Sequence, residues 1–321
     1  MSCMNWIIIN TVSCGWRMRM KGIILAGGSG TRLYPLTLVT SKQLLPVYNK
    51  PMIYYPLSTL MLAKIKDILI ISTPEDTPRI RQLLGDGSAF GISLSYAVQE
   101  KPEGLAQAFT IGKDFIGDDC CAMILGDNIF YGNGLAHKLF KAKEMAENGD
   151  ACVFGYYVED PERYGIMEFT RRDKETDNGA VTVLSVEEKP RKPKSNYAIV
   201  GLYFYPAGVS EKAEQVRPSD RGELEITTLN ELYLQEGKLQ AQLLGRGFTW
   251  MDAGTFDSLC KATNFVSMIE QYQGMTISAP EEIAYRFGWI DDDMIKASAE
   301  KYGKSPYGEH LMAVLEGKII L

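Results

Sequence analysis

The residues best suited to chemistry are glycines and cations near the start of the chain. The segment Leu25-Ala-Gly-Gly-Ser-Gly-Thr-Arg32 follows an apolar run, and glycines there let backbone N–H groups approach a phosphate closely. Arg32 and Lys42 add two cations, of which Arg can bind two phosphate oxygens at once and Lys acts as a point charge. Because cleavage of a triphosphate requires such neutralisation, the segment predicts a phosphate-binding loop.

Two common phosphate-loop patterns fit this segment poorly. Gly22 and Gly27 have the spacing of a Walker A loop, but Gly28 stands where that loop requires lysine. A dinucleotide-binding pattern that begins at Gly28 would place Leu33 at its last glycine. The Walker loop is therefore excluded. A dinucleotide site, or a plain connecting turn, stays open as a weaker interpretation.

The histidine count restricts the kinds of metal site and nucleophile. The chain contains two histidines, His137 and His310, which excludes a histidine-rich zinc site and leaves two candidates for the base of a Ser-His-Asp triad. Any metal is therefore expected to be a hard ion held by carboxylates. Asp127 and Asp252 both follow apolar runs, although an aspartate at such a place could also be a helix cap or a turn residue.

The first half of the chain predicts the elements that would position these residues. Continuous apolar runs at 22–26, 67–72 and 121–125 are typical of buried strands, and 92–98 alternates as a strand. Helical patterns lie between them, at 52–65, 77–84, 105–115 and 135–147. Strands that alternate with helices predict an α/β, Rossmann-like fold, with a mostly parallel mixed sheet flanked by helices.

The pattern changes after residue 150, where strands crowd together and helices become rare. Strands are predicted at 152–158, 165–169, 181–186, 197–205, 239–244 and 248–251, a helix at 223–236, and a hairpin-like loop at 171–179. The chain reads as helical from Thr255 onward. We expect one continuous sheet in a domain over 20–253, with a β-rich second lobe over 151–253 and a helical segment over 254–321.

Composition limits the partners. The 321 residues are 45% hydrophobic and 23% charged, as in an ordinary globular protein, and the net charge of −6 disfavours nucleic-acid binding. No apolar run approaches the roughly 18 residues needed to span a membrane. The six cysteines form no C-x-x-C pair, which predicts reduced thiols and a cytoplasmic location.

Residues 1–19 fit the rest of the chain poorly. Their apolar run Trp6-Ile-Ile-Ile9 is too short for a signal peptide, and the charges Arg17 and Arg19 come after it. We expect a non-native or disordered extension before a functional start at Met20. An arm that docks on a neighbouring molecule is the alternative.

Several motifs together resemble those of the sugar-nucleotide pyrophosphorylases, or sugar nucleotidyltransferases. The resemblance covers about residues 20–310. Its motifs are the glycine-rich loop with its Arg-Leu-Tyr-Pro-Leu-Thr continuation, Lys42-Gln-Leu-Leu-Pro-Val47, Pro51-Met-Ile-Tyr-Tyr-Pro56, Gly104-Leu-Ala-Gln-Ala108, Leu125-Gly-Asp-Asn128, Pro161-Glu-Arg-Tyr-Gly165, Glu187-Glu-Lys-Pro190, Arg221-Gly-Glu-Leu-Glu-Ile226 and Trp250-Met-Asp-Ala-Gly-Thr255. The combination is specific, whereas the glycine-rich loop alone would not be.

The resemblance implies roles for individual residues. Asp127 and Asp252 would bind one Mg²⁺, and together with Arg32 and Lys42 would be catalytic. The nucleotide would be bound by Leu25, Gly27, Gly28, Gly30, Thr31, Arg32, Lys42, Gln99, Gly104, Asp127 and Asn128. The sugar phosphate would be bound by Tyr164, Gly165, Glu188, Lys189, Ile199 and Glu223. A separate allosteric site would include Tyr131, Gly132 and Arg246, although 132–137 departs from the family pattern.

The implied activity is transfer of a thymidylyl group from dTTP to α-D-glucose 1-phosphate, which gives dTDP-glucose and pyrophosphate. This reaction is the first step of dTDP-deoxysugar synthesis, such as that of dTDP-rhamnose for polysaccharides. A homotetramer with feedback inhibition is expected by resemblance. The alternatives are uridylyl transfer or another sugar 1-phosphate nucleotidyltransferase, a non-catalytic nucleotide-binding regulator and, more distantly, a dinucleotide-dependent oxidoreductase.

Overall fold

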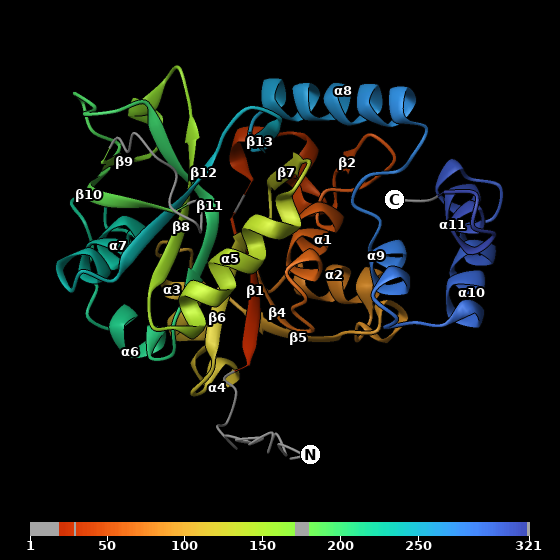
Figure 1. Cartoon of the computed structure of the whole chain (residues 1–321), viewed down its shortest axis with the longest axis horizontal. Coiled ribbons are helices and arrows are strands. Elements are labelled where there is room, and N and C mark those ends of the chain that lie inside the picture. The colour runs from red at the N-terminus through yellow and green to blue at the C-terminus, as the bar shows by residue number, and fades with distance from the viewer. Residues whose placement is uncertain (1–18, 29, 171–179, 320–321) are drawn as a thin grey trace, which may run out of the picture.

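A nine-stranded mixed sheet forms the centre of the molecule (Figure 1). The computed structural model describes residues 19–28, 30–170 and 180–319, so the predicted loop at 171–179 and the extension up to residue 18 lie outside the described part. The strand order is β5-β4-β1-β6-β11-β8-β12-β10-β9. Within the described ranges, no helix combines the length and apolarity that crossing a bilayer requires.

The first half of the sheet is parallel, as predicted. It contains β1 (Met20–Ala26), β4 (Asp67–Ser72), β5 (Ser93–Val98) and β6 (Cys120–Leu125). Alternate side chains of β1 enter different cores: Ile24 joins one apolar cluster, whereas Ile23 and Leu25 join another. Burial on both faces explains why these strands are continuous apolar runs in the sequence.

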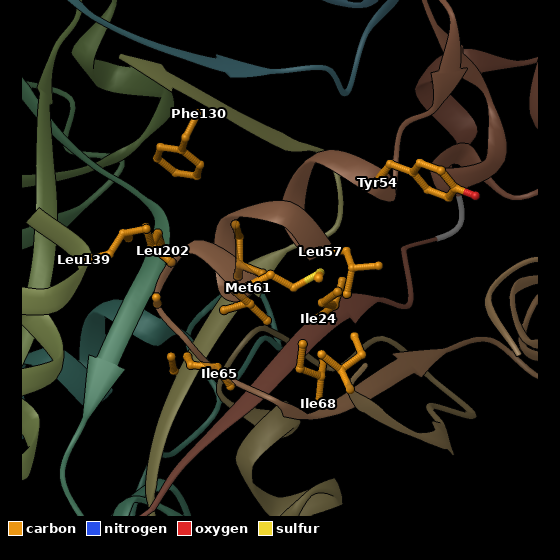
Figure 2. Packing of buried hydrophobic residues seen from close by; sticks show 14 of the residues in the cluster. Ile24, Tyr54, Leu57, Met61, Ile65, Ile68, Phe130, Leu139 and Leu202 are labelled. Atoms are coloured by element: carbon orange, nitrogen blue, oxygen red, sulfur yellow. The ribbon is translucent and has the colours of Figure 1, made fainter. Parts of the chain in front are cut away.

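Helices cover both faces of the sheet. One cluster packs the sheet against α1 (Tyr54–Leu62), α5 (Leu135–Glu147) and α9 (Pro280–Arg286). Figure 2 shows part of this cluster, in which Leu57 and Met61 of α1 lie close to Ile24 of β1. The other cluster includes residues of α3 (Gln107–Ile111), α6 (Val209–Ala213) and α7 (Ile226–Gln235).

The second half of the sheet is largely antiparallel. It contains β8 (Ala151–Tyr157), β9 (Gly165–Phe169), β10 (Ala180–Glu188), β11 (Tyr197–Tyr205) and β12 (Leu239–Leu244). β11 pairs antiparallel with both β6 and β8, and so joins the two halves into the single sheet that was predicted. The β8–β12 pair is parallel.

Two short sheets lie outside this main sheet. β2 (Pro46–Val47) pairs with β3 (Lys50–Pro51), and β7 (Asn128–Gly132) pairs antiparallel with β13 (Phe248–Asp252). The prediction that 248–251 belongs to one continuous sheet was therefore wrong, although the strand itself exists. β7 was not predicted. Its pairing with β13 sets Asp252 opposite Asn128.

The predicted helix at 105–115 is two short helices, α3 and α4 (Lys113–Ile116), on either side of Gly112. A Cβ atom at Gly112 would lie 3.0 Å from the Ala108 carbonyl oxygen and 3.1 Å from Cδ1 of Ile23. The break therefore lies where the backbone packs closely against Ile23 of β1. α2 (Thr77–Leu84) agrees with the prediction, the helix expected from 223 begins at Ile226, and α6 was not predicted.

The C-terminal segment is helical, as expected. α8 (Phe256–Gln273) begins at a capping box made by Thr255 and Ser258. It runs along the edge of the molecule that carries β13, and α9, α10 (Asp292–Tyr302) and α11 (Pro306–Leu315) lie at the end away from β9 and β10 (Figure 1).

Candidate active site

A cavity of about 460 Å³ opens at the carboxyl ends of β1, β5 and β6. Ligands bind at this edge in open α/β sheets, because the loops that follow parallel strands converge there. The cavity brings together most of the predicted site residues, from both halves of the chain: Leu25, Gly27, Gly28, Arg32, Lys42, Gln99, Gly104, Asp127, Asn128, Tyr164, Gly165, Glu188, Lys189, Ile199, Glu223 and Asp252.

The glycine-rich loop leaves β1 at the floor of this cavity. A Cβ atom at Gly27 would lie 1.8 Å from Oε1 of Gln99, so only glycine allows the close packing of these two residues. Gly30 has a φ of 64° and precedes a short 3₁₀ helix at Thr31–Leu33. Leu33, the last residue of this helix, is buried, while the exposed Arg32 lines the cavity.

The Asp127 side chain contacts Lys42 and Asn128 directly, and Trp250 supports it through Asn128. Lys42, from a 3₁₀ helix at Lys42–Leu44, forms a close ion pair with Oδ2 of Asp127. Asn128 Nδ2 donates a hydrogen bond of 2.9 Å to the other carboxylate oxygen, and Trp250 Nε1 donates one of 2.6 Å to Asn128 Oδ1. Asn128 is only 1% exposed, so this chain of contacts fixes the Asp127 carboxylate from the interior.

Asp252 faces the same point in space as Asp127. A Cβ atom at Gly254 would lie 2.8 Å from Oδ1 of Asp252, 3.1 Å from Nη2 of Arg32 and 3.4 Å from Oδ2 of Asp127. The Gly254 backbone N–H also donates a hydrogen bond of 3.0 Å to Asp252. The two aspartates, which are 125 residues apart in the sequence, therefore meet around one glycine.

The two carboxylates have unlike electrostatic surroundings. Burial acts to raise the pKa of Asp127, but Lys42 and the hydrogen bond from Asn128 outweigh it and hold that pKa below its ordinary value. Burial raises the pKa of Asp252, and the negative charge of Asp127 is the second largest cause in the same direction. A cation between the two aspartates would relieve their repulsion.

This pair fits a hard divalent cation. Within the described residues, no cluster of three or more His, Cys, Asp or Glu side chains is present that could hold a metal ion. Two carboxylates without a third such ligand suit Mg²⁺, which usually keeps several waters and takes further oxygens from phosphates.

The pocket that was predicted for the base lies beside the glycine-rich loop. Gln99 is 3% exposed, and its backbone N–H donates a hydrogen bond of 2.8 Å to the Ser72 carbonyl. Gly104 has a φ of 118°, and a Cβ atom there would lie 2.4 Å from the backbone nitrogen of Leu224. Glycine therefore allows the 103–107 loop to pack on the loop that precedes α7.

The predicted sugar-phosphate residues that line the cavity come from the second half of the chain. Glu188, at the end of β10, accepts hydrogen bonds of 2.5 Å from Thr227 Oγ1 and 3.1 Å from Arg221 Nη2. Lys189 follows with a φ of 42°, an unusual conformation for a residue other than glycine. Its backbone N–H donates a hydrogen bond of 3.0 Å to the Tyr164 carbonyl.

Some predicted residues lie elsewhere. Gly30 and Thr31 are in the described part of the loop but do not line the cavity. Tyr131 and Gly132 lie on β7, where they pair with Thr249 and Phe248 of β13. Arg246 is exposed two residues before Phe248, so the predicted allosteric residues gather at one end of this small sheet, outside the cavity.

Other lining residues were not predicted: Gln43, Pro102, Leu105, Leu125, Arg163, Gly201, Tyr203, Glu225, Ile226, Thr227 and Trp250. Trp250 and Glu225 lie inside motifs that carried the resemblance, and Gln43 directly follows Lys42, so their positions gave a signal that was not used. Thr227 and Tyr203 gave no such signal, because the sequence around each residue is that of an ordinary helix or strand.

Comparisons with known proteins agree with this arrangement. The family described as nucleotidyl transferase matches residues 21–268. The glucose-1-phosphate thymidylyltransferases of Neisseria meningitidis and Mycolicibacterium smegmatis are each 54% identical to the chain over 297 residues, which are 92% of this chain and 100% and 99% of the relatives. A solved Bacillus anthracis structure, described under the same enzyme name and in complex with sucrose, has a TM-score of 0.66 and 42% identity, and covers 77% of this chain and 94% of that one. The chain therefore belongs to the nucleotidyl transferase family, in the group of the glucose-1-phosphate thymidylyltransferases.

Proposed function

We propose that the chain transfers a thymidylyl group from dTTP to α-D-glucose 1-phosphate and forms dTDP-glucose and pyrophosphate. Two observations support this function. The relatives that match over nearly their whole length are named for this reaction. In the cavity, two carboxylates face two cations at the edge of the sheet where a nucleotide would lie, and a second group of polar residues stands opposite.

The proposed step is a direct displacement. An oxygen of the sugar phosphate forms a bond to the α-phosphorus while the bond from that phosphorus to the bridging oxygen of the β-phosphate breaks, and pyrophosphate leaves. The attacking phosphate is already an anion, so no general base is required. The work of the protein is to position the two substrates and to neutralise their charges.

Each charged residue has a role in this proposal. Arg32, exposed at the mouth of the cavity, binds the departing pyrophosphate, and Lys42 holds the α-phosphate or the sugar phosphate during attack. Asp127 and Asp252 would hold Mg²⁺, which when bound supplies positive charge to the phosphate oxygens. Lys42 already contacts Asp127, so it lies next to the place where the reacting phosphates would meet the two carboxylates.

The substrate pockets follow from the same geometry. Leu25, Gln99 and Gly104 would contact thymine, and Glu188, Lys189 and Glu223 would bind the sugar hydroxyls and the sugar phosphate. The remaining predicted lining residues, Gly27, Gly28, Asn128, Tyr164, Gly165 and Ile199, would shape the two pockets. A homotetramer, an allosteric site at Tyr131, Gly132 and Arg246, and a cytoplasmic location also stay predictions.

An assay of pyrophosphate release tests the function. All common nucleoside triphosphates would be crossed with several hexose 1-phosphates at saturating Mg²⁺. The highest kcat/KM should belong to dTTP with glucose 1-phosphate. UTP should be a weaker alternative rather than a rejected one, because one methyl group in an apolar pocket contributes only about 1–3 kcal/mol. A preference for a purine triphosphate, or no release with any pair, would contradict the proposal.

A further inference from the structure

We propose that Gln107 is a positioning residue which fixes the side-chain amide of Gln99 in one orientation and so lets the base pocket distinguish thymine from cytosine. This inference rests on the proposed function, because it concerns the base that the cavity accepts. Gln107 does not itself line the cavity. It acts on the nucleotide only through Gln99.

The orientation of the Gln107 amide is set at both of its ends. Gln107 is the first residue of α3, and its Oε1 accepts a hydrogen bond of 3.1 Å from the backbone N–H of Glu103. Its Nε2 donates one of 2.9 Å to Oε2 of Glu103. A backbone N–H can only donate and an ionised carboxylate can only accept, so exchange of the two amide atoms would break both bonds.

The Gln107 amide in turn fixes the orientation of the Gln99 amide. Gln99 Nε2 donates a hydrogen bond of 2.6 Å to Gln107 Oε1, an atom that can only accept. Gln99 Oε1 must then point the other way, and it lies where a Cβ atom of Gly27 would be only 1.8 Å distant. Gln99 therefore presents a fixed carbonyl oxygen to the cavity. The N–H of the same amide that is not donated to Gln107 lies beside this oxygen.

The fixed carbonyl selects among pyrimidines. Thymine and uracil carry an N–H at ring position N3, which a carbonyl oxygen can accept, with a carbonyl group next to it for the amide N–H. Cytosine has an unprotonated N3, so at the same base position two acceptors would face each other. A freely rotating amide could turn over and bind either base. Burial makes the mismatch costly, because an unpaired buried acceptor loses its contact with water.

Three variants, measured with dTTP and with dCTP as donors to glucose 1-phosphate, test this inference. Gln107→Met keeps the length of the side chain but removes both amide atoms. Gln107→Glu still offers Gln99 an oxygen that can only accept, but it loses the donor to Glu103. The double variant Glu103→Gln/Gln107→Glu exchanges the two groups and can re-form all three hydrogen bonds, because the amide introduced at position 103 then serves as the donor. Gln271→Met is a matched control, because Gln271 is exposed on α8 and its side chain donates a hydrogen bond to Ser267 of the same helix, far along the chain from the base pocket.

The measured quantity is the ratio of kcat/KM for dTTP to that for dCTP. Gln107→Met should lower this ratio by about tenfold or more, whereas Gln107→Glu, the double variant and Gln271→Met should retain the wild-type ratio, because each of these keeps an accepting oxygen at position 107. If Gln107→Met is too unstable to assay, Gln107→Lys, which offers Gln99 only donors, takes its place and should lower the ratio in the same way. Equal loss with both donors would assign Gln107 a structural role only, and an unchanged ratio would also overturn the inference. A wild type that fails to use dTTP would instead contradict the proposed function itself.

Discussion

At the scale of single residues, the proposed chemistry depends on two carboxylates with different partners. Asp127 has Lys42 and Asn128 as direct neighbours, whereas Asp252 has only the Gly254 N–H as a hydrogen-bond donor among the described residues. Both approach one point beside Gly254. If they share one Mg²⁺, removal of either charge disables the same ion.

Asp127→Asn and Asp252→Asn should therefore each lower kcat on the order of 10²-fold or more without unfolding the protein. An amide keeps the shape but not the charge that would hold the cation. The double variant should be little worse than either single variant, because effects on one shared ligand are non-additive. The measurement is kcat against Mg²⁺ concentration for the four proteins. Penalties that multiply in the double variant would show two separate roles.

Gln99→Ala tests the base pocket. The variant should raise the KM for dTTP more than the KM for glucose 1-phosphate, because it removes two neutral hydrogen bonds worth roughly 1–3 kcal/mol together. Steady-state kinetics with each substrate varied in turn would show the difference. An equal rise in both KM values would point instead to a collapse of the neighbouring glycine-rich loop onto the vacated space.

Most candidate site residues were predicted from motifs, but the hydrogen bonds and strand pairings that join them were not. The motif places Asp252 after Trp250, yet only the pairing of β13 with β7 brings Trp250 Nε1 to Asn128. The hydrogen bond between Gln99 and Gln107 spans only eight residues, but its direction depends on how the 103–107 loop folds back. Such information lies in backbone geometry that residue types alone do not encode.

At the scale of elements, a buried ion pair connects α8 to β3. Lys50 of β3 forms a 3.0 Å ion pair with Glu270 of α8, and their side chains are 2% and 8% exposed. Glu270 also accepts hydrogen bonds from Asn49 and from the Ile277 backbone N–H. Burial lowers the pKa of Lys50, although the charge of Glu270 acts in the opposite direction.

Lys50→Met should therefore destabilise the protein by about 3–5 kcal/mol, because it leaves the Glu270 carboxylate buried without a cation. The double variant Lys50→Met/Glu270→Leu should recover much of that loss, since a buried ion pair is often matched by apolar residues of similar volume. Denaturant unfolding of the three proteins gives the comparison. A double variant as unstable as Lys50→Met alone would mean that the connection between α8 and β3 depends on the hydrogen bonds that Asn49 and Ile277 donate to Glu270.

The elements that could be predicted were those with a clear pattern of burial. β1, β4 and β6 are apolar throughout because both faces of the sheet are covered, and α5 was placed with its observed bounds. β7 was missed because the strand begins directly after Gly126-Asp127, a sequence typical of a turn. Its strand partner β13 begins 116 positions after β7 ends, and no local pattern specifies so distant a pairing.

At the scale of the whole molecule, the sheet begins at Met20, whose register partner on β6 is Cys120. Removal of residues 1–19 should leave activity and melting temperature nearly unchanged. Arg19 is the described residue that would be lost: its backbone N–H donates a hydrogen bond to the Asp119 carboxylate, and its carbonyl accepts one from the Cys120 N–H. Activity, thermal melting and size in solution would be compared with those of the full chain. Aggregation, or a changed oligomeric state, would favour the alternative of a docking arm.

The reaction of the whole enzyme is tested most directly by following each phosphate of the donor. The chain would be incubated with Mg²⁺, glucose 1-phosphate and dTTP carrying radioactive phosphorus at either the α or the γ position, with Asp127→Asn as the control. The α label should appear in dTDP-glucose and the γ label in pyrophosphate, in equal amounts, only when glucose 1-phosphate is present and not with the variant. An α label that appears in free dTMP, or a γ label that appears in inorganic phosphate, would contradict direct thymidylyl transfer.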